Sequence, residues 1–294
     1  MTTVGFIGLG IMGGPMAVNL VKAGYDVLGY DVTPARTELL VEAGGRAAVG
    51  IAEAVQKADV VVTMVRDSAD VEAVALGDHG ILANSRPGQL YIDTSSISPT
   101  TSRDVAEAAK PLGVRVLDAP VSGGEPGAIE GNLSIMVGGE ADDFEAARPV
   151  LEVVGATVVH VGPHGAGQTV KAANQLIVAG TIELVAEAIV FLEAYGVDTE
   201  AAIRVLAGGL AGNRILDRKA AGMLARRFEP GFRIDLHHKD MGIVTSAARE
   251  AGVVIPLGSA VAQLIASLKA QGDGGLDHSA LLKLVEQLSG RVSR

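Results

Sequence analysis

The sequence contains no cysteine among its 294 residues. Disulfides, thiolate metal sites and cysteine nucleophiles are therefore excluded, and the chain fits a reducing compartment, so we expect a cytoplasmic protein. Aromatic residues make up only 3% of the chain, with no tryptophan, which leaves little material for stacking nucleic-acid bases. Basic residues are outnumbered 24 to 34 by acidic ones, the net charge is −10, and no basic cluster is present. These shortages argue against nucleic acid as a partner.

Long apolar runs are also missing. Ala251–Leu268 carries no charge but is broken by glycine and proline, and Ala172–Ile182 lies between Lys171 and Glu183. Neither approaches the span of about 20 apolar residues that crosses a bilayer. The first ten residues lack a basic region and are typical of a strand rather than of a targeting segment. The sequence therefore predicts no membrane partner.

The first half of the chain alternates short β-branched runs with segments of helical periodicity. Because the runs are apolar on both faces, they are typical of a parallel sheet covered by helices on both sides. The sequence predicts an α/β, Rossmann-type doubly wound sheet, with strands at Val4–Gly8, Asp26–Asp31, Asp59–Val65, Gln89–Asp93, Val114–Leu117, Leu133–Val137 and Thr157–Val161.

Strand patterns end near Pro163. From Gln168 to Tyr195 the sequence predicts one long helix, apolar around much of its circumference. Helical periodicity continues in the later segments, which are Thr199–Ala207, Ile215–Ala225, Lys239–Ala251, Leu257–Ala270 and His278–Leu288. We therefore predict two domains, 1–163 with the sheet and 164–294 all-helical. A helix with more apolar surface than one small domain covers favours a homodimer or homotetramer.

Glycine is abundant, at 38 residues, and three glycines form a motif in Gly8-Leu9-Gly10-Ile11-Met12-Gly13. This is G-x-G-x-x-G between a predicted strand and a predicted helix, the context that binds a dinucleotide. Gly8 allows a tight turn, Gly10 lets the backbone approach a pyrophosphate, and Gly13 allows close helix packing. The helix N-terminus then offers N–H groups to the anion. The alternative is a glycine-rich turn without a ligand.

Asp31 ends the second predicted strand, where an acidic residue holds the ribose 2′-hydroxyl and repels a 2′-phosphate. It favours NAD(H) over NADP(H). Two alternatives stay open: Asp31 caps the helix that begins at Pro34, or Arg36 reaches a 2′-phosphate. Val65 ends the third predicted strand and either borders the dinucleotide or belongs to the core.

Two further groups of residues suggest where a substrate binds and reacts. Ser122-Gly123-Gly124 follows a strand and offers a hydroxyl and approachable N–H groups to a carboxylate, although it is also an ordinary loop sequence. Lys171 shares one helix face with Asn174 and Gln175, and apolar surroundings make a lysine suited to proton transfer near neutrality. The alternative is a solvated lysine at a helix end.

Adjacent histidines, His237 and His238, diverge by ~100° on a helix and have no third ligand at suitable spacing. We interpret them as surface or packing residues, regard the other histidines as scattered, and predict no metal.

The sequence resembles the β-hydroxyacid dehydrogenases, the relatives of 3-hydroxyisobutyrate dehydrogenase, in several short motifs and in their order along the chain. The resemblance covers essentially the whole chain and rests on the phosphate loop with Pro15-Met16, Asp93-Thr94-Ser95-Ser96, Asp118 to Gly124, Gly165 to Gln175, and Lys239-Asp240. Other strings narrow it to the tartronate semialdehyde reductases within that family: Gly123 to Pro126, Gly208 to Gly212, Pro230 to Leu236, and Asp277 to Ala280.

The resemblance implies an oxidoreductase that uses NADH to reduce tartronate semialdehyde, a small anionic substrate, to glycerate. It implies that Lys171 is the catalytic acid, assisted by Asn174 or Gln175, that Ser122, Gly123 and Gly124 hold the substrate carboxylate, and that Ser96 and Lys239 contact the cofactor. The alternatives are 3-hydroxyisobutyrate dehydrogenase or another small-semialdehyde oxidoreductase, and, from another class, a non-catalytic dinucleotide-sensing module.

Overall fold

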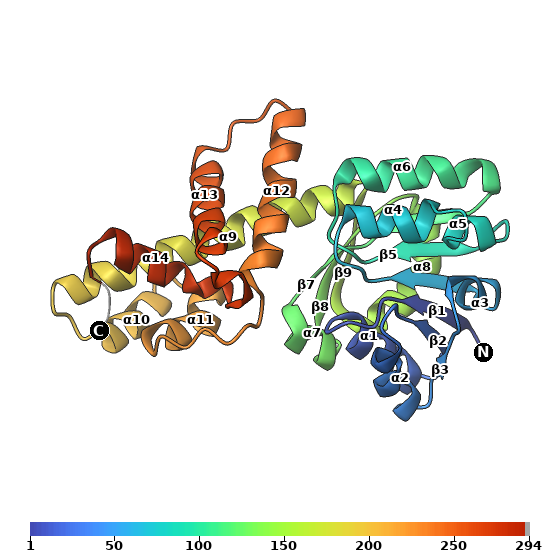
Figure 1. Ribbon diagram of the computed structural model, residues 1–294, viewed down its shortest axis with the longest axis horizontal. Helices are drawn as coiled ribbons and strands as arrows, with labels where there is room; N and C mark the ends of the chain where they lie inside the picture. Colours follow the sequence, from blue (N-terminus) through green and yellow to red (C-terminus); the bar gives the residue numbers. More distant parts are fainter. Residues whose placement is uncertain (292–294) are drawn as a thin grey trace. The chain divides into compact units, whose positions relative to one another are not determined.

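The computed structural model describes residues 1–291. The chain divides into two compact units, Met1–Lys171 and the residues from Ala172 onward (Figure 1). This division falls inside helix α9 (Ala166–Ala194), whereas the predicted domain boundary precedes that helix.

The first unit is built on one sheet with the strand order β3-β2-β1-β4-β5-β6-β8-β7, and β9 pairs with β8. The strands from β3 to β6 are parallel, while β8 runs antiparallel to both β6 and β7. The predicted Rossmann-type class is confirmed. The strands are β1 (Thr3–Ile7), β2 (Asp26–Tyr30), β3 (Arg46–Ala47), β4 (Val60–Thr63), β5 (Leu90–Asp93), β6 (Arg115–Asp118), β7 (Val121–Ser122), β8 (Leu133–Gly138) and β9 (Gly155–Gly162).

Helices cover both faces of this sheet, because successive strand side chains point to opposite faces. Val60 and Val62 of β4 join a core with one set of helices, and Val61 between them joins the core with the other set. The first set is α1 (Gly13–Lys22), α7 (Gly124–Glu130) and α8 (Ala141–Val154); the second is α3 (Ile51–Gln56), α4 (Ser68–Leu76), α5 (Ile81–Asn84) and α6 (Pro99–Ala109). Shorter elements are η1 (Pro34–Thr37), α2 (Glu38–Glu42) and η2 (Lys110–Leu112).

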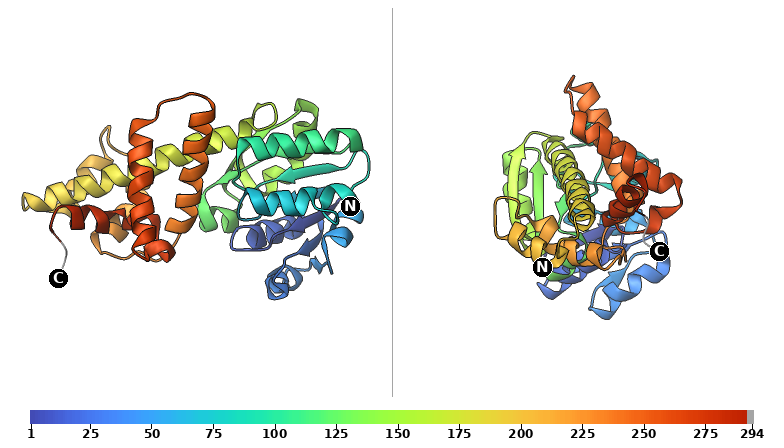
Figure 2. Two further views of the ribbon diagram at one scale, coloured as in Figure 1. Left: turned by 45° about the horizontal axis from the view of Figure 1, so that its top comes forward. Right: turned by 90° about the vertical axis from the view of Figure 1, so that its left-hand side faces the viewer.

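The second unit is helical throughout its described residues, and its helices pack around α9 (Figure 2). Ala179 and Ile182 of α9 are fully buried against α12, α13 and α14, and Ile189 is buried against α11. The elements are α10 (Thr199–Ala207), α11 (Arg214–Leu224), α12 (Ile234–Glu250), α13 (Pro256–Ala270), η3 (Asp273–Gly275), η4 (His278–Ala280) and α14 (Leu281–Leu288).

Helix α9 is the one helix within residues 1–291 that is long and apolar enough to cross a membrane. Length and composition alone are weak support for a membrane span, because the central helix of a folded core passes the same test. In this unit α9 contributes buried side chains to two apolar clusters, which accounts for its composition.

Candidate functional site

The loop between β1 and α1 needs two of its three glycines for folding. Gly8 has φ +94°, and a Cβ there would lie 2.3 Å from the Met64 carbonyl oxygen. A Cβ on Gly13 would lie 1.9 Å from the Gly8 oxygen. Gly10 differs, because a Cβ there would meet no protein atom within 4 Å. Packing therefore does not explain Gly10, and the open space over its backbone fits a pyrophosphate approaching the start of α1.

Asp31, the residue after β2, is hydrogen-bonded to this loop. Its buried carboxylate accepts hydrogen bonds from the Leu9 N–H at 2.8 Å and from the Thr33 N–H at 2.8 Å. The Arg36 guanidinium forms an ion pair with Asp31 at 3.3 Å. Asp31 thus orders both the phosphate loop and the turn before η1, and Arg36 is directed at this carboxylate.

The ends of β4 and β5 are connected by side chains. The Ser95 hydroxyl accepts from the Val65 N–H at 2.9 Å, and Asp93 accepts from the Thr63 hydroxyl at 2.7 Å and from the Ser95 N–H at 3.1 Å. Burial raises the pKa of Asp93 to about 6. Val65 lies two residues beyond β4 and is half-buried against the core, and Ser96 is half-buried in the next loop. These contacts give the loops at this edge of the sheet a defined shape.

The first turn of α9 is tied to the same edge of the sheet. Asp118, the last residue of β6, accepts from the Gly165 N–H at 2.8 Å and from the Gln168 N–H at 3.0 Å. The Gln168 side chain donates to the Ser95 carbonyl at 2.8 Å and accepts from the Ile97 N–H at 3.1 Å. The carboxylate caps exposed N–H groups at the helix start. Asp118 and Gln168 therefore determine where the next turn of α9 lies.

That next turn carries Lys171, which is buried, with 8% of its surface exposed. Its Nζ donates a hydrogen bond to the Val121 carbonyl at 2.7 Å. The alternative of a solvated lysine at a helix end is therefore wrong. Val121 precedes Ser122 in β7, so the ammonium group lies beside the segment predicted to hold a carboxylate.

The structure gives Ser122-Gly123-Gly124 a defined backbone path, and its predicted role in holding a carboxylate stays a prediction. Ser122 ends the strand β7, Gly123 has φ +148°, and Gly124 begins helix α7. The segment is a sharp strand-to-helix turn, a backbone path that a residue with a Cβ rarely takes.

The two amides after Lys171 belong to a polar chain in the helical unit. Asn174 donates to the Gln175 oxygen at 2.8 Å, and Gln175 donates to the Asp240 carboxylate at 2.5 Å. Asp240 is also paired with Lys239 at 2.9 Å. Gln175 and Asp240 are buried, whereas Asn174 and Lys239 are half-buried. Gln175 therefore uses both ends of its amide within the protein, and the predicted contact of Lys239 with the cofactor stays a prediction.

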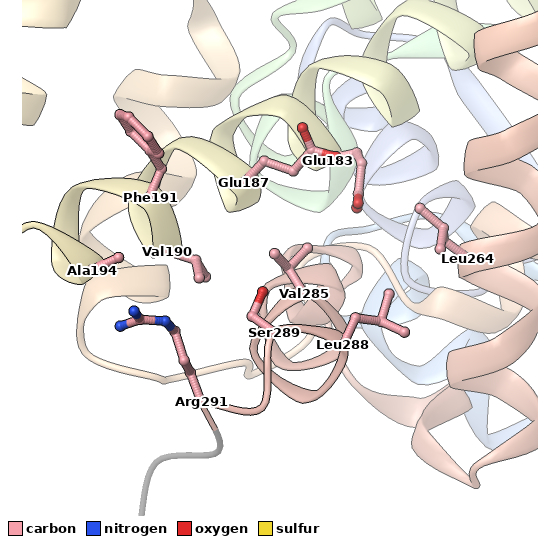
Figure 3. A pocket seen from close by; sticks show the side chains of 10 residues that line it. All are labelled: Glu183, Glu187, Val190, Phe191, Ala194, Leu264, Val285, Leu288, Ser289 and Arg291. Atoms are coloured by element: carbon pink, nitrogen blue, oxygen red, sulfur yellow. The ribbon is translucent and has the colours of Figure 1, made fainter.

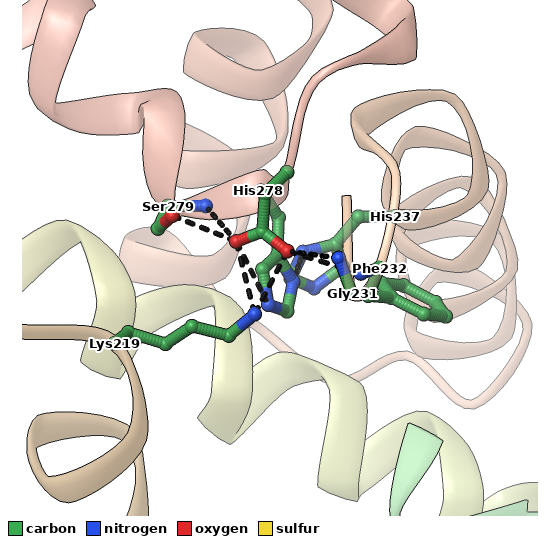
Figure 4. A network of polar contacts seen from close by, with 7 residues as sticks. Lys219, Gly231, Phe232, His237, His278 and Ser279 are labelled. Carbon is green, nitrogen blue, oxygen red and sulfur yellow. Dashed lines mark hydrogen bonds and ion pairs between the residues drawn. The ribbon is translucent and has the colours of Figure 1, made fainter. Parts of the chain in front are cut away.

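The histidines are less scattered than the sequence suggests. His237 and His278 are buried with their Nδ1 atoms 3.0 Å apart, and Phe232 packs against both rings (Figure 4). Asp277 beside them binds Lys219 at 2.8 Å. The two Nδ1 atoms form one hydrogen bond with each other, which takes a single proton. Both rings are buried and packed against Phe232, which supports the interpretation of His237 as a packing residue. Within residues 1–291 no group of three or more His, Asp or Glu side chains is placed to hold a metal ion.

This network predicts a loss of stability in acid. Burial, with the nearby His237, lowers the pKa of His278 well below 6.5, so the folded protein keeps His278 neutral while the unfolded chain takes up a proton. Stability from this group is complete above pH 6.5 and decreases as the pH falls. We expect the difference in unfolding free energy between wild type and His278→Asn to shrink between pH 7 and pH 5, measured by urea denaturation. A constant difference contradicts this, and His79→Asn on the surface is the control.

Sequence reasoning missed the roles of Asp118, Gln168 and Asp240. Asp118 and Asp240 belong to motifs that carry the family resemblance, but the sequence analysis gave neither residue a role of its own. Their partners lie 47 to 73 residues away along the chain, and no local pattern signals such contacts. A buried acid at the end of a strand was the single available signal for Asp118.

Comparison with known proteins agrees with this geometry. Residues 3–162 match the NAD-binding domain of 6-phosphogluconate dehydrogenase, and residues 165–285 match the NAD-binding domain of NADP-dependent 3-hydroxyisobutyrate dehydrogenase. The chain is 42% identical to a 2-hydroxy-3-oxopropionate reductase of Escherichia coli, over 97% of this chain and 98% of that protein. The chain belongs to the β-hydroxyacid dehydrogenases related to 3-hydroxyisobutyrate dehydrogenase.

Other β-hydroxyacid dehydrogenases match nearly as well but carry different names. A 3-hydroxyisobutyrate dehydrogenase of Pseudomonas aeruginosa is 40% identical, over 97% of this chain and 98% of that one. The structure of Mycobacterium tuberculosis 3-hydroxyisobutyrate dehydrogenase with L-serine has a TM-score of 0.88 at 37% identity, covering 97% of this chain and 99% of that one. The protein is thus an oxidoreductase that acts on a CH–OH group with a nicotinamide dinucleotide.

Proposed function

We propose that this protein reduces tartronate semialdehyde (2-hydroxy-3-oxopropanoate) reversibly to glycerate, using NADH. The observation that carries the proposal is the buried Lys171, whose Nζ lies 2.7 Å from the Val121 carbonyl beside Ser122. A buried ammonium group next to a hydroxyl and a glycine turn suits a small anionic carbonyl compound. The 42% identity to a 2-hydroxy-3-oxopropionate reductase supports this substrate.

The phosphate loop and Asp31 would hold the dinucleotide. Gly10 leaves its backbone open to the pyrophosphate, and the start of α1 offers N–H groups. Asp31 would accept from the ribose hydroxyls, while Val65 and Ser96 would border the cofactor. When bound, the cofactor supplies the hydride that reduces the aldehyde carbon.

Lys171 would donate the proton that the carbonyl oxygen takes up as the aldehyde becomes an alcohol. Its hydrogen bond to the Val121 carbonyl and the anchoring of α9 by Asp118 hold Nζ in one place. Such positioning supplies much of the rate in a reaction between bound groups. Ser122 and the N–H groups of Gly123 and Gly124 would hold the substrate carboxylate.

We assign the substrate-side amide to Asn174. Gln175 is buried, and its amide is engaged by Asn174 and Asp240, so it serves to position its neighbours. Asn174 is half-buried on the same helix, one turn after Lys171.

Substrate choice is tested with a panel of semialdehydes, following NADH absorbance. We expect kcat/KM for tartronate semialdehyde to exceed that for the analogue with a C2 methyl group by at least about tenfold, because a site that binds a hydroxyl rejects its absence. The reverse order would identify a 3-hydroxyisobutyrate dehydrogenase. NADH binding without turnover of any semialdehyde would favour a dinucleotide-sensing module.

Cofactor choice is tested at Asp31. We expect a lower KM for NADH than for NADPH, because the carboxylate repels a 2′-phosphate. Asp31→Asn keeps an acceptor for the Leu9 N–H and removes the charge, so the preference for NADH should narrow by at least about tenfold. A wild-type protein that prefers NADPH contradicts the assignment.

We also propose that the protein is a homo-oligomer. Ile177, Leu184 and Phe191 are more than 60% exposed on α9 and recur every seven residues, the spacing of a helix-packing seam. Burying such a stripe against a second copy removes apolar surface from water.

A further inference from the structure

Helix α9 has different surroundings at its two ends. Toward its C-terminal end it lines a pocket of the helical unit with Glu183 and Phe191, and Phe191 belongs to the exposed stripe that we propose to bury against a second copy (Figure 3). The first turn of α9 instead belongs to the sheet unit and carries Gln168. The position of that turn matters, because Lys171 follows Gln168 by three residues and lies on the same face of the helix.

The Gln168 side chain binds both peptide groups next to Ser96. It is buried, with 1% of its surface exposed. Its Nε2 donates at 2.8 Å to the Ser95 carbonyl, in the peptide bond before Ser96, and its Oε1 accepts at 3.1 Å from the Ile97 N–H, in the peptide bond after Ser96. A carboxamide matches this pair because it has one donor group and one acceptor group. One side chain of the helix that carries Lys171 therefore holds Ser96 from both sides.

Ser95 extends this connection to the second loop assigned to the cofactor. Its hydroxyl accepts from the Val65 N–H at 2.9 Å, and its N–H donates to Asp93 at 3.1 Å. Val65 and Ser96, the two loop residues proposed to border the dinucleotide, are thus connected to α9 through Ser95 and Gln168. A buried network whose members are hydrogen-bonded to one another holds them in one geometry.

We infer that Gln168 is a positioning residue for the reduction: it sets the separation between the Lys171 ammonium group and the loops proposed to border the cofactor. The inference rests on the proposed roles of Lys171 and Ser96. The aldehyde takes up a hydride at its carbon and a proton at its oxygen, so the proton donor and the loops around the cofactor must keep a fixed separation. Gln168 acts through Ser96 and Lys171 rather than on the substrate.

Gln168→Met tests this inference, because methionine has nearly the same length and donates no hydrogen bond. We expect kcat to fall at least about tenfold, since a displacement of about 1 Å at a reacting group can cost about 100-fold. The dissociation constant of NADH, measured by fluorescence titration, should stay within about threefold of wild type, because the phosphate loop and Asp31 are unchanged. Hydrogen exchange of the Ile97 amide, measured by NMR without NADH, should become faster.

Gln89→Met is the matched control. Gln89 is also a buried amide, with 3% of its surface exposed, and its Nε2 donates to the Val55 carbonyl at 2.8 Å and to the Ala58 carbonyl at 2.9 Å. It lies before the first residue of β5, whereas the site residues follow the other end of that strand. Both methionine variants should lower stability in urea, but Gln89→Met should keep the kcat of wild type.

Gln168→Glu separates the donated hydrogen bond from the accepted one. At pH 8 the carboxylate still accepts from the Ile97 N–H but donates nothing to the Ser95 carbonyl, so kcat should be low while the Ile97 amide stays protected. A protonated carboxyl group makes both hydrogen bonds, and burial raises the pKa of a carboxyl group. As the pH falls from 8 to 6, the ratio of the variant kcat to the wild-type kcat should therefore rise at least about threefold.

Other charged groups face this turn of α9, and the wild type contains all of them. Asp118 on β6 and Asp93 after it in space on β5 are buried, which raises the pKa of both. Arg103 on α6 lies against the start of α9, His164 precedes that helix, and Lys171 follows one turn later. Because these groups titrate in both proteins, their contribution cancels in the ratio of the two kcat values.

Three results overturn the inference: wild-type kcat in Gln168→Met, a constant ratio between pH 8 and pH 6 in Gln168→Glu, or an equal loss of kcat in Gln89→Met. Gln168→Glu decides the question if Gln168→Met does not fold. Lys171→Ala distinguishes this failure from that of the proposed function. If Lys171→Ala loses turnover while Gln168→Met keeps it, only the positioning role fails. If Lys171→Ala keeps turnover, the proposed function fails as well.

Discussion

Replacing Lys171 by alanine is expected to lower kcat by at least about 100-fold while NADH still binds. General acid catalysis contributes about 10²- to 10⁴-fold, and the Lys171 Nζ lies beside β7, 2.7 Å from the Val121 carbonyl oxygen. The buried position of Lys171 makes this loss larger than that expected for an exposed lysine. Stopped-flow measurement of NADH oxidation gives kcat, and fluorescence titration gives the NADH dissociation constant.

Two variants show that the loss belongs to proton transfer. Lys171→Arg keeps a positive charge but gives up its proton far less readily, so it should remain at least about tenfold impaired. Lys110→Ala, on the surface of the sheet unit, should behave as wild type. Near-normal turnover by Lys171→Ala, with NADH bound, would remove Lys171 from the mechanism.

Changing Gly10 to alanine is expected to raise the dissociation constant of NADH by at least about tenfold without destabilising the protein. The added methyl group would meet no protein atom within 4 Å, so folding has no reason to oppose it. It would instead occupy the space through which the pyrophosphate approaches the backbone. We expect the unfolding free energy to stay within about 0.5 kcal/mol of wild type, measured by urea denaturation.

Gly13→Ala provides the contrast to this result. Its Cβ would lie 1.9 Å from the Gly8 oxygen, a backbone atom that cannot move aside cheaply. We therefore expect a loss of stability of about 1–3 kcal/mol or more, typical of overpacking. If Gly10→Ala also unfolds the protein, or binds NADH as tightly as wild type, the open space over the Gly10 backbone is not the dinucleotide site.

The elements that sequence predicted well are those with local causes. β1, β2 and β5 lie within one or two residues of their predicted bounds, because runs of buried β-branched residues signal strands. α10 has its predicted bounds, since Asp198 caps it at the Ala201 N–H, 3.0 Å away. The phosphate loop was recognisable because turn geometry requires Gly8 and close packing requires Gly13, at the spacing of a known motif.

Elements with distant causes were missed or misplaced. α7 contains glycine and proline and was not among the predicted helices, but Asn19 of α1 donates to the Ala128 carbonyl at 2.8 Å and stabilises its end. α12 begins at Ile234, five residues before the predicted start at Lys239. There the Ile234 N–H donates to the Leu276 carbonyl at 2.9 Å, a contact that no local pattern contains.

The sequence by itself determined the chemistry available to this protein. It excluded thiol chemistry, predicted that the glycine loop and Asp31 hold a dinucleotide, and singled out Lys171 and Ser122 as candidate site residues. Tertiary structure decided which of these groups lie together. Lys171 is buried beside β7 because Asp118 and Gln168 hold the first turn of α9, and the Gln175 amide donates to Asp240, 65 residues away along the chain. The physical reason is that helix and strand periodicity are local, whereas burial and hydrogen-bond partners depend on residues far apart in the chain.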